Sequence, residues 1–260
     1  MRTANLWSKD ELILAFNLYL KLPFGKMHTR TPEIIELANI TGRSVNSIAI
    51  RLTNYASCDP YHQNRGVKGM DGGKKQCQPI WEEFFQNKET LIFESERILA
   101  EKENQTIENK YSELLFDLKD LRGETKLREV KTRVNQNVFR QIVVANYSGK
   151  CALTGIDIPD LLFASHIIPW SKNEDERLNP ENGICLSALY DKACDKGLIG
   201  INERFEVIIS SDLKKKSKNE YYAKYFSHLE NEKIILPNRY LPNKLFLEYH
   251  LDEIFAKRNL

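Results

Sequence analysis

The segment from Cys151 to Ile201 constrains the fold of this 260-residue chain more than any other part of it. Apolar runs and loop residues alternate in it, and they predict a strand at 161–168, a polar loop, a second strand at 184–186 and a helix at 187–196 that Gly197 closes. The segment therefore predicts a small unit of two strands and one helix. With helical patterns elsewhere in the chain, the expected fold class is α+β.

Side chains able to carry chemistry stand at defined points of this segment. His166 ends the first strand, and its neutral imidazole suits proton transfer near pH 7. Asn182 follows sixteen residues later, and its amide can hold the histidine loop or bind a metal through its oxygen. Asp191 and Asp195 are four apart, so on a helix they share a face and can bind one cation. A lone histidine is more often structural, and two such aspartates are more often a solvated face, but together these groups can hydrolyse a phosphodiester.

Further residues extend the pattern over roughly 128–258, namely Arg133-Val-Asn-Gln136, Phe139-Arg140, Tyr147, Cys151, Thr154-Gly155, Ser165-His-Ile-Ile-Pro169-Trp170, Arg177-Leu-Asn-Pro180, Asn182-Gly183, Asp191 through Gly197 and Leu245-Phe-Leu-Glu-Tyr-His250. In this order and spacing the chain resembles the HNH endonucleases. More narrowly, it is similar to HNH nucleases of bacterial restriction systems. The resemblance implies a ββα-metal motif, with a histidine base on the first strand, an asparagine between and metal ligands on the helix.

The resemblance implies a role for each matching residue. His166 would be the general base, and Asn182 would orient it or help to hold the metal. Asp191 and Asp195 would be the helix ligands of Mg²⁺ or Mn²⁺, because carboxylates favour hard cations over zinc. Ser165 stands where many relatives have Asp or His, and Tyr190-Asp191 stands where many have histidine or a His-Asp pair. These departures keep an alternative open, a DNA-binding regulator with a degenerate nuclease domain.

The N-terminal residues 7–55 predict three short helices. Ser8 and Glu11 form a capping box, Thr31-Pro32 starts a helix through Ala38, and Ser44 caps a third helix after a glycine-containing turn. Two helices joined in this way suggest a helix-turn-helix, although a helical packing domain has the same pattern. In the third helix Val45, Ile48, Leu52 and Tyr55 are expected to be buried. The candidate DNA-binding residues are Arg43, Asn46, Ser47, Arg51 and Asn54.

The middle of the chain predicts a connector between two domains. Residues 56–79 are rich in polar residues and glycine and predict a long loop, and Pro79 to about Leu121 predicts a helix. Its apolar residues recur in steps of four and three, as in a coiled-coil seam or a core-packed helix, at Ile107, Tyr111, Leu114, Leu118 and Leu121. The expected domains are 1–87 for DNA recognition, 88–121 as the helical connector and 122–260 as the nuclease, with 93–121 a candidate dimer interface.

The distribution of charge adds a possible DNA path. The net charge is only +2, but residues 122–150 carry seven Lys or Arg against two Asp or Glu. Such a block beside the site fits phosphate contact, although a solvated face is the commoner explanation. The candidates are Arg128, Arg133, Arg140 and, in the loop of the site, Arg177. The lysine run 214–218 is a solvated loop or a phosphate rail, and residues 198–201 and 205–209 predict a hairpin.

Cysteine usage and hydropathy narrow the class of protein. The five cysteines form no C-x-x-C pair, which argues against a disulfide framework and a zinc ribbon. The first residues have no apolar signal core, and no apolar run approaches the ~18 residues of a membrane span. The sequence thus predicts an intracellular, cytoplasmic, metal-dependent endonuclease of double-stranded DNA. It would be a restriction type that is specific for a sequence or for modified bases, and a homodimer, because a double-strand cut needs two sites or sequential nicks.

Overall fold

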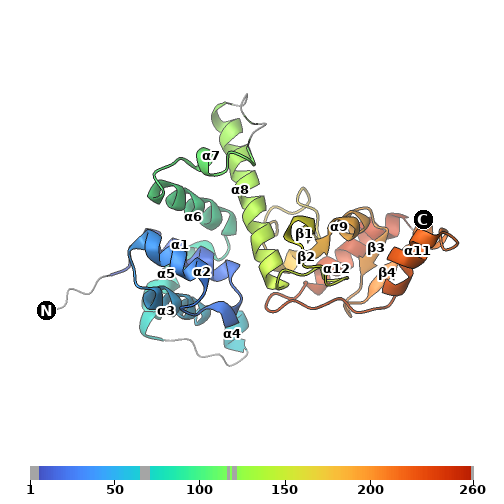
Figure 1. Ribbon diagram of the computed structural model, residues 1–260, viewed down its shortest axis with the longest axis horizontal. Helices are drawn as coiled ribbons and strands as arrows, with labels where there is room; N and C mark the ends of the chain where they lie inside the picture. The colour runs from blue at the N-terminus through green and yellow to red at the C-terminus, as the bar shows by residue number, and fades with distance from the viewer. Residues whose placement is uncertain (1–5, 65–70, 116–117, 119–121, 259–260) are drawn as a thin grey trace. The chain divides into compact units, whose positions relative to one another are not determined.

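The computed structural model describes residues 6–64, 71–115, 118 and 122–258 (Figure 1). The chain divides into two compact units, Met1–Val138 and Phe139–Leu260, and the division falls inside one helix. Helices dominate, and the strands pair in two two-stranded antiparallel sheets. The expected α+β class is therefore confirmed. No helix in the described part of the chain is both long and apolar enough to cross a membrane.

The first unit is helical. Its elements are α1 (Lys9–Lys21), the 3₁₀ turn η1 (Phe24–Lys26), α2 (Pro32–Thr41), α3 (Val45–Ala56), α4 (Pro60–Asn64), the 3₁₀ turn η2 (Asp71–Gly73), α5 (Lys74–Phe84), α6 (Lys88–Lys102), α7 (Ile107–Lys110) and the first part of α8 (Gly123–Asn146). Helix α1 is buried from Leu12 to Leu20 and contacts α3, α5 and α6. It is the centre of this unit because every residue from Leu12 to Leu20 except Asn17 is apolar.

The helix starts in this unit follow the local sequence. Ser8 Oγ accepts from the Glu11 amide while the Glu11 carboxylate accepts from the Ser8 amide, so the capping box is confirmed. Ser44 Oγ accepts from the Ser47 amide at the start of α3. Helix α2 starts at Pro32 as predicted but continues to Thr41, beyond Ala38. These caps satisfy amides that have no partner within the helix, which is why the starts can be predicted from sequence.

Aromatic side chains fill the core around α1. The Phe16 ring stacks on Tyr55 of α3 with centroids 4.8 Å apart and on Trp81 of α5 at 5.0 Å. The Tyr55 hydroxyl donates to the Leu12 carbonyl at 2.9 Å, so this buried polar group is satisfied. Helix α5 therefore covers the end of α3, and this contact decides which α3 residues are buried.

Two predictions for the middle of the chain are wrong. The expected loop 56–79 contains α4, η2 and the start of α5, with residues 65–70 outside the described part. In the described part of the expected continuous helix from Pro79 to Leu121, the chain is divided into α5, α6 and α7. Pro79 lies inside α5, and Gly123 begins α8.

The apolar repeat of the expected connector belongs to a core. Within the described residues, Ile107, Leu115 and Leu118 pack with Val130 and Val134 of α8, and Tyr111 lies against this cluster. Leu121 lies outside the described residues. Leu114, another residue of the repeat, is exposed. Core packing therefore accounts for Ile107, Tyr111 and Leu118 of the repeat.

The second unit begins within α8 and contains both sheets. Its elements are the 3₁₀ turn η4 (Pro159–Leu161), β1 (Leu162–His166), the 3₁₀ turn η5 (Pro180–Asn182), β2 (Gly183–Ser187), α9 (Ala188–Asp195), β3 (Ile199–Ile201), β4 (Val207–Ile209), α10 (Ser211–Lys214), α11 (Glu220–Tyr225), the 3₁₀ turn η6 (Ser227–Leu229), α12 (Lys244–His250), the π-helical turn η7 (Leu251–Phe255) and the 3₁₀ turn η8 (Ala256–Arg258). The predicted order of strand, loop, strand and helix, followed by a hairpin, is confirmed.

The register of β1 and β2 positions the candidate residues. Leu162 pairs with Ser187 at one end, and His166 pairs with Gly183 at the other. Helix α9 starts directly after β2 and packs on both strands. The end of β1 and the carboxylates of α9 are thus held on one small scaffold of backbone hydrogen bonds.

Gly197, which follows α9, should tolerate no side chain. Its φ is +64°, and an added Cβ would lie 2.6 Å from the Ile254 carbonyl oxygen. Gly197→Ala is expected to lower the free energy of unfolding by about 1–3 kcal/mol. The cost of a left-handed conformation at a non-glycine residue and the cost of the clash between the new Cβ and the backbone add together. The matched control is Gly149→Ala, with φ +70° and open space around the added Cβ. Urea denaturation of both variants checks this, and equal losses would show that the Ile254 contact does not matter.

Candidate active site

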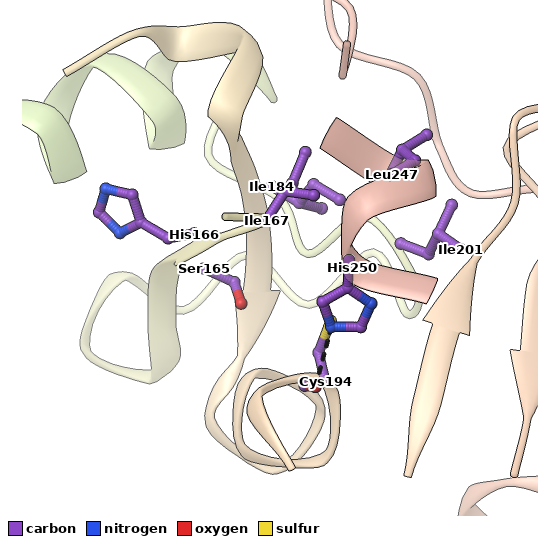
Figure 2. A pocket seen from close by; sticks show the side chains of 8 residues that line it. All are labelled: Ser165, His166, Ile167, Ile184, Cys194, Ile201, Leu247 and His250. Carbon is purple, nitrogen blue, oxygen red and sulfur yellow. Dashed lines mark hydrogen bonds between the residues drawn. The ribbon is translucent and has the colours of Figure 1, made fainter. Parts of the chain in front are cut away.

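The side chains of Ser165 and His166 lie on opposite faces of β1, as those of successive strand residues do. Figure 2 shows the His166 ring on the opposite side of the strand from Cys194 and His250. The ring stacks on Phe139 of α8, with centroids 4.1 Å apart and planes at 16°, and meets the edge of Trp170 at 5.4 Å. Two aromatic side chains therefore fix the plane of the imidazole.

The hydrogen bond of His166 fixes which nitrogen carries the proton. Nε2 lies 2.9 Å from the Arg177 carbonyl oxygen, which can only accept. In the neutral ring Nε2 is therefore protonated, and Nδ1 has the free lone pair. Burial lowers the pKa of His166 below its ordinary value of 6.5, while the hydrogen bond to Arg177 and the charge of Asp195 act in the opposite direction. The imidazole is thus neutral near pH 7, with Nδ1 able to take a proton.

Asn182 holds the loop that follows His166. Its side chain is 1% exposed, and its Oδ1 accepts from the Ile168 amide at 2.7 Å. Its Nδ2 donates to the carbonyl oxygens of Ile168 at 3.2 Å and Glu176 at 3.0 Å. Of the two roles expected for Asn182, these contacts favour positioning of the loop over metal binding, because the amide oxygen is buried against backbone.

Arg177 stabilises the loop that follows His166, in which it lies. Its Nε donates to the Trp170 carbonyl at 2.7 Å, and its guanidinium lies over the Trp170 ring, 5.2 Å from the centroid. Its second nitrogen pairs with Glu174 at 3.1 Å. These contacts favour a structural role for Arg177 over the expected contact with phosphate. The side chain instead fixes the loop whose carbonyl holds His166.

The carboxylates of α9 lie beside β1. Asp191 is half-buried and Asp195 is exposed. Burial and then the negative charge of Asp195 raise the pKa of Asp191, while Ser165 and Lys192 act to lower it. The two carboxylates therefore repel each other, as expected for residues four apart on one helix face. A cation between them would relieve that repulsion.

The oxygen atoms near α9 fit a hard divalent cation. Ser165 Oγ is buried and lies close enough to Asp191 to lower the pKa of that carboxyl. With the two carboxylates it forms a donor set of oxygen only, which suits Mg²⁺ or Mn²⁺ with several bound waters. Within the described ranges, no three His, Cys, Asp or Glu side chains group to hold a metal. The side chains here that could hold a cation are therefore two carboxylates, with the hydroxyl as a weak third.

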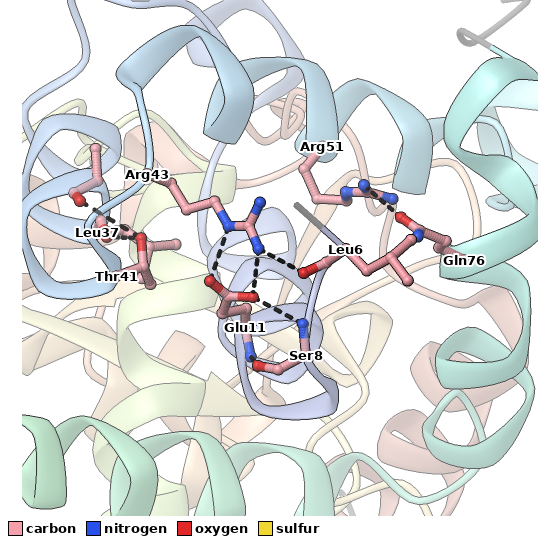
Figure 3. A network of polar contacts seen from close by, with 9 residues as sticks. Leu6, Ser8, Glu11, Leu37, Thr41, Arg43, Arg51 and Gln76 are labelled. Atoms are coloured by element: carbon pink, nitrogen blue, oxygen red, sulfur yellow. Dashed lines mark hydrogen bonds and ion pairs between the residues drawn. The ribbon is translucent and has the colours of Figure 1, made fainter. Parts of the chain in front are cut away.

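Three of the residues predicted to bind DNA, Arg43, Arg51 and Asn54, make contacts within the first unit or are buried in it. Arg43 pairs with Glu11 at 2.8 Å and donates to the Leu6 carbonyl (Figure 3). Its guanidinium also lies over the Trp7 ring. Arg51 is 7% exposed and donates to Gln76 and the Gly73 carbonyl. Asn54 is 2% exposed. Arg51 and Asn54 are buried because α5 and η2 cover that part of α3.

The other predicted DNA contacts differ in accessibility. Asn46 is exposed and Ser47 half-buried, both at the start of α3, so they stay available to a ligand. Arg128 is exposed on α8. Arg133 donates to the Leu114 carbonyl at 2.8 Å, and Arg140 donates to the carbonyl oxygens of Leu162 and Pro159. Arg140 therefore holds the start of β1, a structural role that the sequence did not indicate.

Sequence reasoning gave no role to Phe139, Trp170 or His250. Phe139 and Trp170 border the His166 ring, and His250 is buried against α9. All three belong to the residues that resemble the HNH nucleases, and that resemblance was the available signal.

The comparison with protein families agrees with this geometry. The family model of the HNH endonucleases matches residues 151–202, which include β1, β2, α9 and β3. This segment is an HNH endonuclease domain. The HNH match covers about a fifth of the chain and supports nuclease activity, a hydrolase reaction on DNA. No curated protein sequence matches the chain.

Proposed function

We propose that the chain is a metal-dependent HNH endonuclease that hydrolyses phosphodiester bonds of double-stranded DNA, in a bacterial restriction system. The observation that carries the proposal is the imidazole of His166, which is held through Nε2 by the Arg177 carbonyl and leaves Nδ1 free. His166 lies within electrostatic range of Asp195, on the HNH segment. The restriction role and the choice of double-stranded DNA rest on the resemblance of residues 128–258.

In this proposal each side chain has one task. His166 Nδ1 accepts the proton of the attacking water, and Arg177 and Asn182 keep the loop in place around the ring. Phe139 and Trp170 hold the ring plane. Asp191, Asp195 and Ser165 would hold Mg²⁺ or Mn²⁺. The bound ion supplies charge stabilisation for the phosphoryl group and the departing 3′ oxygen.

The remaining parts of the proposal concern how DNA is bound. Residues 1–87 would bind the duplex, residues 88–121 would connect the two domains, and residues 122–260 would cleave the DNA. Of the surface expected to touch DNA, Asn46, Ser47 and Arg128 keep accessible side chains. A symmetric homodimer would supply two active sites for a double-strand cut, which predicts linear product without prior accumulation of nicked circles.

Cleavage of supercoiled plasmid tests the proposal. Methylated and unmethylated plasmid should be cut with Mg²⁺ or Mn²⁺ and left intact with chelator, and the better-cut form shows whether modification is required or protective. Asp191→Asn is expected to lower the rate at least about 100-fold, because it removes a charged metal ligand. Asp157→Asn, an exposed carboxylate outside α9, is the matched control and should cut normally.

One other function has an observation in its favour. Ser165 occupies the position where many relatives carry a first-strand metal ligand, which fits a DNA-binding regulator with a degenerate nuclease domain. Duplex binding without cleavage of either plasmid, with either metal, would establish the regulator and overturn the endonuclease.

A further inference from the structure

His250, the last residue of α12, contacts the end of α9. It is 3% exposed, and its Nε2 lies 3.1 Å from the Cys194 carbonyl oxygen and 3.5 Å from Cys194 Sγ. Figure 2 shows the ring directly beside Cys194. Because a carbonyl oxygen only accepts, Nε2 of His250 is the donor.

This bond anchors the turn that carries Asp195. The Cys194 carbonyl belongs to the last turn of α9, where helical carbonyls lose their partners within the helix. It accepts from the Gly197 amide at 2.8 Å and from His250, and Asp195 is the next residue along the chain. A helix of eight residues is marginal without tertiary support, so the position of its carboxylates depends on such contacts.

The residues after His250 pack against the same end of α9. The Ile254 carbonyl abuts Gly197, and a Cβ added at Gly200 would lie 2.7 Å from Leu251 and 3.1 Å from Phe255. These contacts come from the π-helical turn η7, a kind of turn that is frequent at functional sites. The C-terminal segment 244–255 is therefore packed tightly against the end of α9 and β3.

His250 also borders the buried face of β1. A cavity of about 10 Å³ lies between Ser165, Cys194, Leu247 and His250, and it has room for about one water molecule. The packing therefore continues with little free space from α12 through α9 to the residue that precedes His166 (Figure 2).

We propose that His250 is a positioning residue of the HNH site, whose Nε2–H bond to the Cys194 carbonyl holds Asp191 and Asp195 in the arrangement that binds the metal. This inference rests on the proposed function and deepens it. His250 does not touch the reacting atoms. It acts through the backbone of α9.

The test compares substitutions of His250 that remove the hydrogen-bond donor with one that keeps a donor. His250→Leu keeps a bulky side chain and removes the donor, whereas the amide of His250→Gln can reach the same carbonyl. Leu247→Ala is the matched control, since Leu247 is 2% exposed on the same helix and is apolar. For each full-length variant, Mn²⁺ affinity is measured by electron paramagnetic resonance, kcat and KM by plasmid cleavage, and stability by urea denaturation.

His250→Leu is expected to weaken Mn²⁺ binding and lower kcat about 10- to 100-fold, as supporting residues of metal ligands do, with KM for DNA unchanged. His250→Gln should recover most of both. Leu247→Ala should lose stability and keep Mn²⁺ affinity. If His250→Leu does not fold, His250→Asn, whose amide is too short to reach, replaces it beside His250→Gln.

Two outcomes would overturn the inference in different ways. If the wild type binds Mn²⁺ and cuts DNA, and the donor-free variant at 250 changes Mn²⁺ affinity no more than Leu247→Ala does, the positioning role alone is lost. If the wild type neither binds Mn²⁺ nor cuts DNA, the proposed function fails and the positioning role fails with it.

Discussion

Replacing His166 with alanine is expected to lower the rate of DNA cleavage by about 10²- to 10⁴-fold, the usual contribution of a general base. The substitution removes Nδ1, the ring atom left free by the bond between Nε2 and the Arg177 carbonyl. DNA binding should persist, because the ring is packed against Phe139 and Trp170 and is only partly exposed. Single-turnover cleavage of plasmid and a separate duplex-binding assay measure the two effects.

The pH dependence of wild-type cleavage tests the same role. A base works when unprotonated, and burial lowers the pKa of His166 below 6.5. The rate should therefore change little above pH 6.5 and fall only as the pH drops through that lowered pKa. In His166→Ala this decline should disappear, because no imidazole is left to titrate at this position.

Two further experiments show whether the loss of cleavage is specific to His166: substitution of another histidine, and rescue of His166→Ala with added imidazole. His228→Ala changes an exposed histidine of the same unit and should leave cleavage unchanged. Added imidazole should restore part of the rate of His166→Ala, since Phe139 and Trp170 border the space left by the ring. A His166→Ala protein that cuts within twofold of the wild type would remove His166 from the mechanism.

Replacing Glu96 with alanine is expected to lower the free energy of unfolding of the first unit by about 3–5 kcal/mol, the cost of breaking a buried ion pair. Glu96 is 2% exposed on α6, and its Oε1 accepts from Lys21 at 2.6 Å and Asn17 at 3.1 Å. Its Oε2 accepts from the Tyr111 hydroxyl at 2.8 Å. The alanine variant would leave these three donors buried or partly buried without their acceptor.

Acid should weaken the same interaction. Burial by itself would raise the pKa of Glu96, but Lys21, followed by Tyr111 and Lys110, holds it below 4.5. A carboxyl group with a lowered folded-state pKa stabilises fully above its unfolded pKa, about 4.3 for Glu. That stability is lost as the pH falls through the lower, folded-state pKa. The wild type should therefore lose stability in this acidic range more steeply than Glu96→Ala.

Urea denaturation followed by tryptophan fluorescence measures both effects, because Trp7 and Trp81 lie in the first unit. The control is Glu101→Ala on the same helix, where an exposed pair with Arg97 should contribute less than about 1 kcal/mol. Equal losses in the two variants would show that the Glu96 cluster adds nothing beyond a surface ion pair.

Local patterns were sufficient for the elements of the HNH segment and for the helix starts. The order of β1, β2 and α9, the hairpin β3–β4, the Ser8–Glu11 capping box and the Ser44 cap all depend on residues close together in the chain. Hydrogen bonds and apolar periodicity over a few residues determine them, so the sequence displays them directly. The spacing of Asp191 and Asp195 was informative for the same reason.

The sequence by itself determined the HNH segment, the identity of its chemical groups and most element starts, whereas the tertiary structure decided what each polar side chain binds. Arg51 and Asn54 stand off the apolar stripe of α3 but are buried because α5 and η2 cover them. The tautomer of His166 depends on a carbonyl eleven residues away, and the contact of His250 with α9 spans 56 residues. Such partners meet only when the whole chain packs, and no local period or spacing records them.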